Sequence, residues 1–593
     1  MTDPRAAYQA RLGACRLRIA ALEATHLRIS NGRLVVALIG AILLWFAISR
    51  GWSPLWPIAA GLMFFALVVV HARLLQRLER ARRAAGWYAR GLLRIDGEWA
   101  GERRDGAPFL KGHTYGRDLD LFGHASLFQL LNTATTEIGE ETLATWLKSA
   151  APIPEVLARQ VAVAELRDKT VFREELAVLA AETEISRTGS MAAWASASPA
   201  GLTVAVAVVF AACALVTIVV LALTFAERIP SRYFVLWLIA AGAIAAIWRK
   251  PVHQVLARIG SADRDLSLVR DALARIESET VQSPRLMAIK DALFTEGMPP
   301  SRRIDELRRL VSWLDSSRNQ LFAPIAFAIL LPQQLAVAID RWHSRYGRRV
   351  VEWLTAIGEL EALAALATYS FEHPHDPFPV VSETGPRFDA AGLAHPLMRE
   401  DTSVRNDVTL GGPGEPRILV ISGSNMSGKS TLLRSVGVNV VLALAGAPVR
   451  ATRLTLSPLA LGATLKVEDS LEEGHSRFYA EILRIKSIVD TARGSTPLLF
   501  LLDEILHGTN SHDRRIGAEA IVKALADAGA VGLVTTHDLA LTELPSRLGA
   551  VAVNKHFEDR LVDGKMVFDY RMQPGVVEHS NALALMRAVG LEV

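Results

Sequence analysis

Four apolar stretches, arranged as two close pairs, constrain the fold of this chain more than any other feature. They cover residues 34–49, 55–70, 202–225 and 233–248. A helix needs about 20 mostly apolar residues to cross a bilayer, and only a short loop separates the two stretches of each pair. The pattern predicts two transmembrane helical hairpins, with buried helices of a soluble core as the alternative. A cleaved signal peptide is a poor explanation, because a second apolar stretch follows the first at once.

The basic residues predict how these hairpins are oriented. Arginines are dense on both polar flanks of the first hairpin, and Arg249 and Lys250 follow the second. Because basic residues gather on the cytoplasmic side of membrane spans, we expect both flanks in the cytoplasm and only the two short loops outside. Arg228 and Arg232, in the second loop, oppose this rule. With no targeting signal and an Ala- and Arg-rich composition, the sequence predicts a multi-pass protein of a bacterial inner membrane, its soluble domains cytoplasmic.

Composition excludes several classes of protein. Hydrophobic residues make up 51% of the chain and charged residues 21%, which fits neither a disordered nor a wholly membrane-embedded protein. The two cysteines, Cys15 and Cys213, are far apart, which argues against a disulfide scaffold or a cysteine-ligated zinc site. The net charge of +4 is weak evidence for nucleic acid, since much of the arginine excess flanks apolar stretches.

The rest of the chain can be divided into regions by the spacing of its apolar residues. Residues 118–200 and 252–369 carry apolar residues at helical spacing, and residues 322–331 predict a short buried helix. Pro and Gly are dense between residues 373 and 416, where residues 373–377 predict a linker. Beyond Arg417 short aliphatic runs alternate with helical stretches, which is typical of an α/β domain with a mostly parallel sheet. The predicted order is a cytoplasmic segment (1–33), the first hairpin (34–72), a helical linker with the start of a helical core (73–200), the second hairpin (201–248), a helical lever (249–372) and the α/β domain (373–593).

A phosphate-binding loop follows the strand-like run at 417–422. Its residues match G-x-x-x-x-G-K-[ST] between a strand and a helix. The backbone N–H groups of such a loop wrap phosphates at a helix N-terminus, Lys429 would contact the β- and γ-phosphates, and Ser430 would hold Mg²⁺. The predicted ATP-binding residues are Gly423, Ser424, Asn425, Met426, Ser427, Gly428, Lys429, Ser430 and Thr431.

Two later strand ends supply the remaining chemistry. Asp503 and Glu504 follow the buried run at 497–502, and His537 follows the run at 531–534. We expect Asp503 to bind Mg²⁺, Glu504 to act as general base toward the attacking water, and His537 to sense the γ-phosphate. Capping acids and a structural histidine are the alternatives. Together these residues predict a Mg²⁺-dependent ATPase with Glu504, His537 and Lys429 as catalytic residues.

At this point the sequence resembles the MutS family of DNA mismatch-repair ATPases. The likeness rests on GSNMSGKST at 423–431, on residues 446–449 and 469–478, on Asp503-Glu504 followed by residues 508–511 and Asp513, on Thr536-His537, on the tail around residues 568–591, and upstream on residues 395–397 and 406–407. Residues 126–166 are similar to the start of the family's helical core. The resemblance implies DNA as partner, and a homodimer with composite ATP sites to which Asn510 and Ser511 contribute.

The chain also departs from the family pattern. Asn510 stands where relatives usually have serine, no N-terminal domain with a wedge phenylalanine is evident, and no strand-rich insertion resembles the DNA clamp. Basic residues around Arg302 and Arg348 could touch DNA phosphates, although a solvated helix face is the alternative. The sequence therefore predicts a membrane-anchored MutS-like ATPase acting on DNA. The alternative is the same ATPase coupled to a protein or membrane partner; transport is the weakest hypothesis, because the hairpins hold few polar groups.

Overall fold

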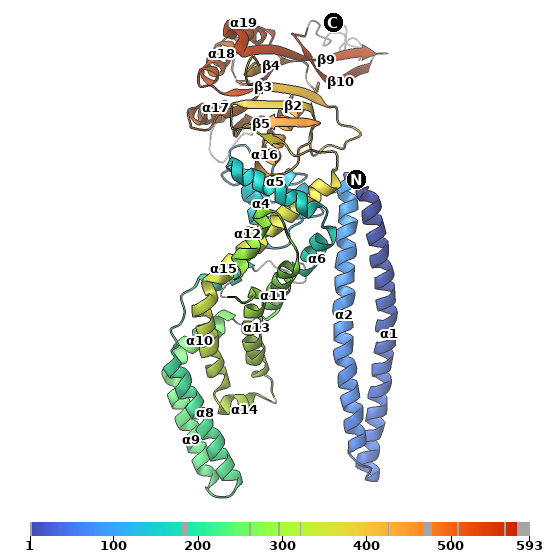
Figure 1. Ribbon diagram of the computed structural model, residues 1–593, viewed down its shortest axis with the longest axis vertical. Helices are drawn as coiled ribbons and strands as arrows, with labels where there is room; N and C mark the ends of the chain where they lie inside the picture. The colour runs from blue at the N-terminus through green and yellow to red at the C-terminus, as the bar shows by residue number, and fades with distance from the viewer. Residues whose placement is uncertain are drawn as a thin grey trace.

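The computed structural model places an α/β domain at one end of an elongated molecule and the tips of two helical hairpins at the other, with helical bundles between (Figure 1). It describes residues 3–180, 188–259, 263–294, 297–320, 322–424, 426–466, 477–506, 509–562 and 565–577. The predicted class, a helical core with two hairpins followed by an α/β domain, matches this architecture.

The first hairpin consists of two very long antiparallel helices, α1 (Pro4–Arg50) and α2 (Leu55–Asp96). Asp3 caps α1 by accepting from the backbone N–H of Arg5, and Gly51 ends it in the left-handed region at φ 66°. At about 1.5 Å per residue, α1 is roughly 70 Å long. The predicted apolar stretches therefore form only the outer part of the hairpin, and its polar part continues as a stalk toward the α/β domain.

The helical core surrounds one central helix, α15 (Leu331–Glu372). Helices in 118–200 and 252–369 were expected, and helices fill most of the described residues of both ranges. Around α15 lie α3 (Leu127–Leu131), α4 (Glu137–Lys148), α5 (Ile153–Arg167), α6 (Thr170–Ala180), α7 (Thr188–Ser196), α10 (Arg249–Ile259), α11 (Asp263–Ser278), α12 (Pro284–Leu293), α13 (Pro300–Ser316) and α14 (Ala323–Ala328).

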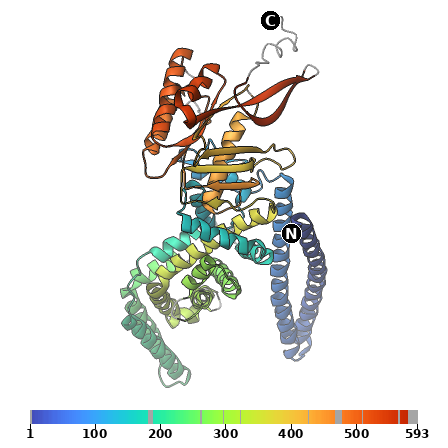
Figure 2. The ribbon, with the colours of Figure 1, turned by 45° about the horizontal axis from the view of Figure 1, so that its top comes forward.

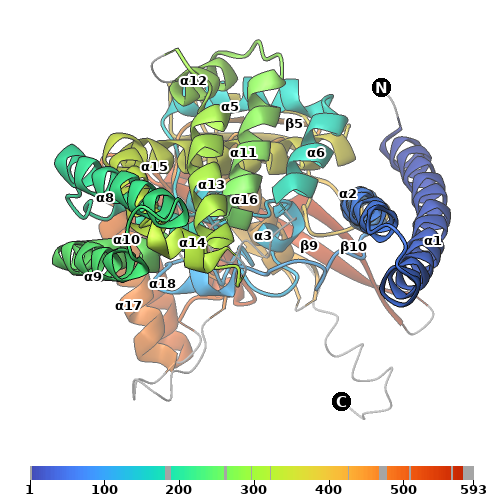
Figure 3. The ribbon, with the colours of Figure 1, turned by 90° about the horizontal axis from the view of Figure 1, so that it is seen from below.

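The second hairpin, α8 (Val204–Phe225) and α9 (Ser231–Ile247), ends at the same end of the molecule as the first. Seen from below, the two hairpins stand on opposite sides of the helical core (Figure 3). Among the residues that the structure describes, three helices are long and apolar enough to cross a membrane, namely α1, α2 and α8. The predicted fourth span meets this test only when α9 is joined to α10 across a 75° bend.

The expectation of a buried helix at residues 322–331 is wrong. Helix α14 covers only Ala323–Ala328, and within it only Ala326 is buried. Ile325 and Phe327 are 58% and 69% exposed. The apolar run suggested a core position, but this short helix lies at the lower end of the core in Figure 1, toward the hairpin tips, where few elements cover it.

Three buried carboxylates on α15 hold separate elements to it. Asp340 accepts from the backbone N–H groups of Ala200 and Leu202 at 2.7 and 2.8 Å, just before α8. The Glu361 carboxylate accepts four hydrogen bonds just before and at the start of α4, from the backbone N–H and the hydroxyl of both Thr135 and Thr136. Glu372 pairs with Arg94 of α2.

The α/β domain contains two sheets (Figure 2). The larger has the order β10-β9-β4-β8-β7-β6, in which all neighbours are parallel except β10 and β9. Its strands are β4 (Ile418–Ser422), β6 (Ala460–Thr464), β7 (Leu498–Asp503), β8 (Val531–Thr536), β9 (Ala552–Val562) and β10 (Lys565–Pro574), and its helices are α16 (Lys429–Ala445), α17 (Arg477–Ala492), α18 (Ser511–Asp527) and α19 (Leu544–Leu548). The predicted mostly parallel sheet is confirmed.

The second sheet was not predicted. It has the order β1-β5-β2-β3 and consists of β1 (Val380–Val381), β5 (Arg453–Leu456), β2 (Arg387–Leu393) and β3 (Asn406–Gly411). It occupies the Pro- and Gly-dense region. The predicted linker at 373–377 does join α15 to this sheet, and it is firmly packed, because the buried Arg450 guanidinium lies 3.4 Å from Asp376 and 3.1 Å from the His373 ring.

Candidate nucleotide-binding site

The loop between β4 and α16 has the conformation that its glycines allow. All five residues of β4 are buried aliphatic or small side chains, which fixes the strand in the centre of the sheet. Gly428 precedes α16 at φ 104°, a region that favours glycine, and a Cβ added there would lie 3.2 Å from the Tyr570 ring. The loop thus presents backbone N–H groups at a helix N-terminus, which is a favourable place for phosphate. Asn425 lies outside the described residues.

Lys429, the first residue of α16, is held inside this loop. Its Nζ donates to the carbonyl oxygens of Gly423 at 2.8 Å and Ser424 at 2.7 Å. The side chain is only 4% exposed, and burial lowers the pKa of its ammonium group. A buried cation whose partners are carbonyl dipoles would gain from a negative phosphate in the same place.

Glu504 links the loop to the two other predicted strand ends. Its Oε1 lies 3.8 Å from Lys429 Nζ, and its Oε2 lies 3.5 Å from His537 Nδ1. The parallel order β4-β8-β7 places all three strand ends at one edge of the sheet. Glu504 itself has φ 48°, in the left-handed region that non-glycine residues rarely adopt outside sites with a structural or functional demand.

Thr535 fixes the turn that carries both acidic residues. Its hydroxyl donates to Asp503 Oδ1 and accepts from the backbone N–H of Glu504 at 3.1 Å. The hydroxyl thereby ties β8 to the end of β7. The sequence placed this threonine at the strand end before His537 but did not predict its contact with Asp503 and Glu504, because that contact depends on the neighbouring strand and not on a local motif.

A cavity of about 600 Å³ opens beside the loop. Its lining includes the loop, α16 and Glu504, together with His395, Asn406, Phe557 and Tyr570 from the two sheets. Of the predicted residues, Met426, Gly428, Lys429, Ser430, Thr431 and Glu504 line it. The volume lies in the usual range for a small-molecule site.

The far wall of this cavity is fixed by polar contacts. The Asn406 amide donates to the Tyr570 carbonyl at 3.0 Å, and its oxygen accepts from the Met572 N–H at 2.7 Å, so one side chain joins β3 to β10. Burial lowers the pKa of His395 to about 4, and the positive charge of Arg434 adds to this effect. His395 is therefore neutral at pH 7, and its Nδ1 accepts from the Leu397 N–H at 3.2 Å.

The predicted magnesium ligands have suitable chemistry. Ser430 supplies a hydroxyl and Asp503 a carboxylate, and Mg²⁺ prefers oxygen ligands. Among the residues that the structure describes, no group of three or more His, Cys, Asp or Glu side chains could hold a metal ion. A magnesium ion at this site would therefore need phosphate and water oxygens to complete its coordination, as is usual for a nucleotide-bound ion.

Asn510 is exposed and is not among the described residues that line the cavity. Asn510 caps α18, accepting from the Asp513 N–H at 2.9 Å and donating to the Asp513 carboxylate at 2.8 Å. The resemblance implies that Asn510 and Ser511 contact a partner's nucleotide, which stays a prediction.

Known proteins match the same region of the chain. A model of the family domain described as MutS domain V matches residues 419–592, which include the loop, the acidic pair and His537. The C-terminal part of this chain belongs to the MutS family. "DNA mismatch repair protein MutS" of Natronomonas pharaonis is 34% identical over 254 residues, 41% of this chain and 28% of that protein.

Further relatives show similar coverage. "DNA mismatch repair protein MutS 2" of Halobacterium salinarum is 32% identical over 44% of this chain and 30% of its own length. "DNA mismatch repair protein MutS" of Geobacillus thermodenitrificans is 31% identical over 45% and 29%. The chain thus spans less than a third of the length of these MutS relatives.

Proposed function

We propose that this protein is a Mg²⁺-dependent ATPase of the MutS type, held at a membrane by its two helical hairpins. The observation that carries the proposal is the position of Glu504, between Lys429 and His537 and in the lining of the cavity beside the phosphate-binding loop. Strand ends that are distant in sequence thereby bring a cation, a carboxylate and an imidazole together where the γ-phosphate of a bound nucleotide would lie.

Each residue then has a definite task. The loop N–H groups and Lys429 bind the phosphates, and Ser430 and Asp503 hold Mg²⁺, which neutralises developing phosphate charge. Glu504 orients a water molecule and accepts its proton as the water oxygen attacks the γ-phosphorus and the bond to the ADP oxygen breaks. His537 contacts the γ-phosphate. The walls formed by His395, Asn406 and Tyr570 would enclose the nucleoside.

The ATPase is tested with the full-length protein in lipid nanodiscs. Lys429→Ala should abolish turnover and weaken ATP binding, whereas Glu504→Gln should abolish turnover and leave binding largely intact. Lys486→Ala is the control, because Lys486 is an exposed lysine of α17 that pairs with Asp490. Wild-type hydrolysis rates in both site variants would refute the assignment.

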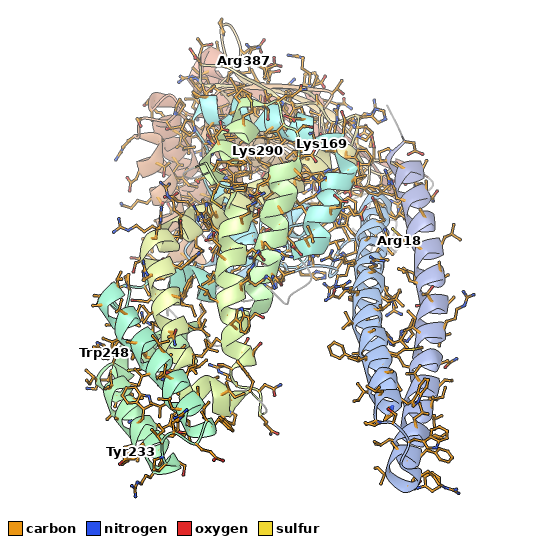
Figure 4. The ribbon with its side chains drawn as sticks, turned by 60° about the horizontal axis from the view of Figure 1, so that its bottom comes forward. Arg18, Lys169, Tyr233, Trp248, Lys290 and Arg387 are labelled. Carbon is orange, nitrogen blue, oxygen red and sulfur yellow. The ribbon has the colours of Figure 1, made fainter. Side chains whose placement is uncertain are left out.

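The membrane assignment rests on the hairpin tips. Large apolar side chains stand exposed along them, among them Leu34 at 64%, Ile48 at 78% and Phe65 at 66%; soluble proteins rarely expose contiguous apolar patches of this kind. Tyr233 lies at the tip of the second hairpin and Trp248 at its other end (Figure 4), as expected of residues at the two interfaces of a bilayer. The protein should remain in the membrane pellet after alkaline carbonate extraction, and its release would contradict this part of the proposal.

DNA is the partner that the relatives' names indicate, and we extend it to this chain as part of the proposal. The test is binding of the nanodisc-embedded protein to matched, mismatched and branched DNA, with and without ATP. A second candidate is a protein or membrane partner. It is favoured by the hairpin tips, which lie far from the ATPase domain and expose large apolar side chains. Intact ATP hydrolysis with no DNA binding at moderate salt would select the second candidate.

The composite homodimer is tested separately. Asn510→Ala should lower ATP turnover if the residue reaches the partner's nucleotide, and Asn510→Ser should restore turnover, because serine also caps a helix. Full activity in the alanine variant would remove Asn510 from the proposed site.

A further inference from the structure

A second cavity, of about 370 Å³, lies where α2 passes α6 and the loop before α4. It is far from the phosphate-binding loop in the sequence and shares no lining residue with the first cavity. Its lining is rich in guanidinium groups, which come from Arg82, Arg83, Arg90, Arg94 and Arg103. Such a concentration of one charge around a cavity needs an explanation.

Three of these arginines have acidic partners. Arg82 pairs with Glu23 at 2.7 Å, Arg83 with Glu79 at 3.1 Å, and Arg94 with Glu372 at 2.6 Å. Within the described part of the chain Arg90 and Arg103 form no ion pair, and Arg103 donates only to the carbonyl oxygen of Ala134. The cavity therefore holds two guanidinium groups outside any ion pair among the described residues, with Glu102 acting on Arg90, and Glu140 and Glu361 on Arg103, only at longer range.

The electrostatics of the two unpaired arginines are unfavourable. Burial lowers the pKa of Arg103 to about 10, and the charge of Arg90 adds to the effect. Burial also lowers the pKa of Arg90, with a further contribution from Arg94. A guanidinium remains charged at pH 7 even so, so the repulsion persists in the folded protein.

Two lining residues also have buried polar atoms without a hydrogen-bond partner among the described residues. They are Nη1 of Arg83 and Oδ1 of Asn132. Buried polar atoms nearly always have partners in folded proteins. Both residues line the cavity, so the packing around it leaves one donor and one acceptor unsatisfied.

We propose that this cavity binds a phosphate-bearing anion. Guanidinium groups match phosphate oxygens in charge and in bidentate geometry. The volume is near the lower end of the range for small-molecule sites, which fits inorganic phosphate, pyrophosphate or the phosphate end of a small metabolite, and excludes a duplex nucleic acid.

The position along α2 favours a soluble anion over a lipid headgroup. The apolar stretch of α2 ends at residue 70, and Arg90 lies 20 residues further on. At about 1.5 Å per residue this is roughly 30 Å from the end of the stretch, beyond the reach of a headgroup in a flat bilayer.

Such an anion would join the first hairpin to the helical core. Arg90 belongs to α2, whereas Arg103 and Asn132 belong to the segments that lead to α4. Glu361 of α15 holds the adjoining residues Thr135 and Thr136. Bound phosphate would therefore stabilise the contact between the stalk and the core, independently of the ATPase reaction.

The test uses the full-length protein in nanodiscs of neutral lipid. A Lys429→Ala background removes the lysine of the phosphate-binding loop, so that phosphate effects there are weakened. Thermal unfolding is followed during titration with inorganic phosphate and with pyrophosphate, against chloride at equal ionic strength. The variants are Arg90→Gln and Arg103→Gln, and the control is Arg77→Gln, an exposed arginine of α2 outside the cavity lining.

We expect the parent and the control to be stabilised by phosphate, and both cavity variants to bind it at least tenfold more weakly. Without phosphate, Arg90→Gln should unfold at the same temperature as its parent or higher, which separates loss of binding from loss of folding. If stabilisation appears only in nanodiscs rich in anionic lipid, and disappears in Arg90→Gln, the anion is a headgroup. An equal phosphate response in the parent and in Arg90→Gln, or no stabilisation in either arm, would overturn the proposal.

Discussion

Glu372→Gln should detach the first hairpin from the core. The Glu372 carboxylate accepts from Nε and Nη2 of Arg94 at 2.8 and 2.6 Å, and from the Tyr8 hydroxyl at 3.2 Å, so one residue of α15 holds both α1 and α2. The side chains of Arg94 and Glu372 are 7% and 1% exposed. Removing one partner of a buried ion pair leaves an uncompensated charge and costs about 3–5 kcal/mol. The docking equilibrium should fall by a factor of roughly a hundred to several thousand.

Hydrogen exchange of the full-length protein measures this directly. In Glu372→Gln, backbone amides of the upper part of α2 and the start of α1 should exchange faster, while those of α16 should not change. Asp490→Asn is the control, because its pair with Lys486 is exposed and such surface pairs contribute little to stability. The double variant Arg94→Met/Glu372→Leu should recover most of the loss, since apolar replacement of a buried pair is often neutral. A loss below about 1 kcal/mol, or a double variant as unstable as Glu372→Gln, would refute the reasoning.

Three further predictions concern single residues. Because the His395 pKa is lowered from 6.5 to about 4, the unfolded chain binds a proton at a higher pH than the folded protein does. The stability that neutral, buried His395 contributes is therefore complete above pH 6.5 and falls by up to about 3 kcal/mol as the pH drops toward 4. His395→Gln should lack that slope in thermal unfolding, and equal slopes would show that another group is responsible. Gly428 has φ 104°, and an added Cβ would lie 3.2 Å from the Tyr570 ring, so Gly428→Ala should cost about 1–3 kcal/mol of strain and weaken ATP binding. Gly13→Ala is the control, because a Cβ at Gly13 has nothing within 4 Å, and it should leave ATP affinity unchanged. Wild-type ATP affinity in Gly428→Ala would contradict the prediction. Asp340→Asn retains only one side-chain acceptor for the N–H groups of Ala200 and Leu202 and should destabilise the start of α8 by about 1.5–3 kcal/mol. Hydrogen exchange of these two amides should become faster. Unchanged exchange would show that Asp340 does not hold this segment.

The edge of the sheet that carries Glu504 and His537 could be predicted from the sequence because its geometry is a property of parallel sheets. Each of the three segments is a buried aliphatic strand followed by polar residues, and strands of one parallel sheet end at the same edge. Asp503, Glu504 and His537 were therefore expected near Lys429, and the distances of 3.8 and 3.5 Å from the Glu504 carboxylate agree.

The walls of the cavity could not be predicted in the same way. Strands β2 and β3 are short and contain Gly or polar residues, and β2 pairs with β5, more than 60 residues further along the chain (Asp389 with Thr455). Their stability comes from this pairing and not from a local hydrophobic period. The resemblance included residues 395–397 and 406–407, and His395 and Asn406 both line the cavity, whereas Phe557 comes from a strand that no motif marks.

The length of the first hairpin could not be predicted from the sequence either. Hydropathy marks only the apolar part of α1 and α2, while the stalk packs through aromatic and charged residues. Tyr8 is fully buried against Trp87 and Tyr88, with ring centroids 5.6 Å apart in both pairs. Such a cluster in a segment dense in arginine has no transmembrane signal.

The three carboxylates of α15 restrict how nucleotide chemistry could move the hairpins. Asp340 and Glu372 are 32 residues apart on one helix, or about 48 Å at 1.5 Å per residue, and they hold the start of the second hairpin and the upper part of the first. Glu361 lies between them and holds α4, which packs against α16 behind the phosphate-binding loop. Breaking either end contact costs several kcal/mol because the groups are buried. The two hairpins therefore cannot tilt independently at low cost. A conformational change that begins at the phosphate-binding loop would be transmitted by a movement or bend of α15, which would move both hairpins.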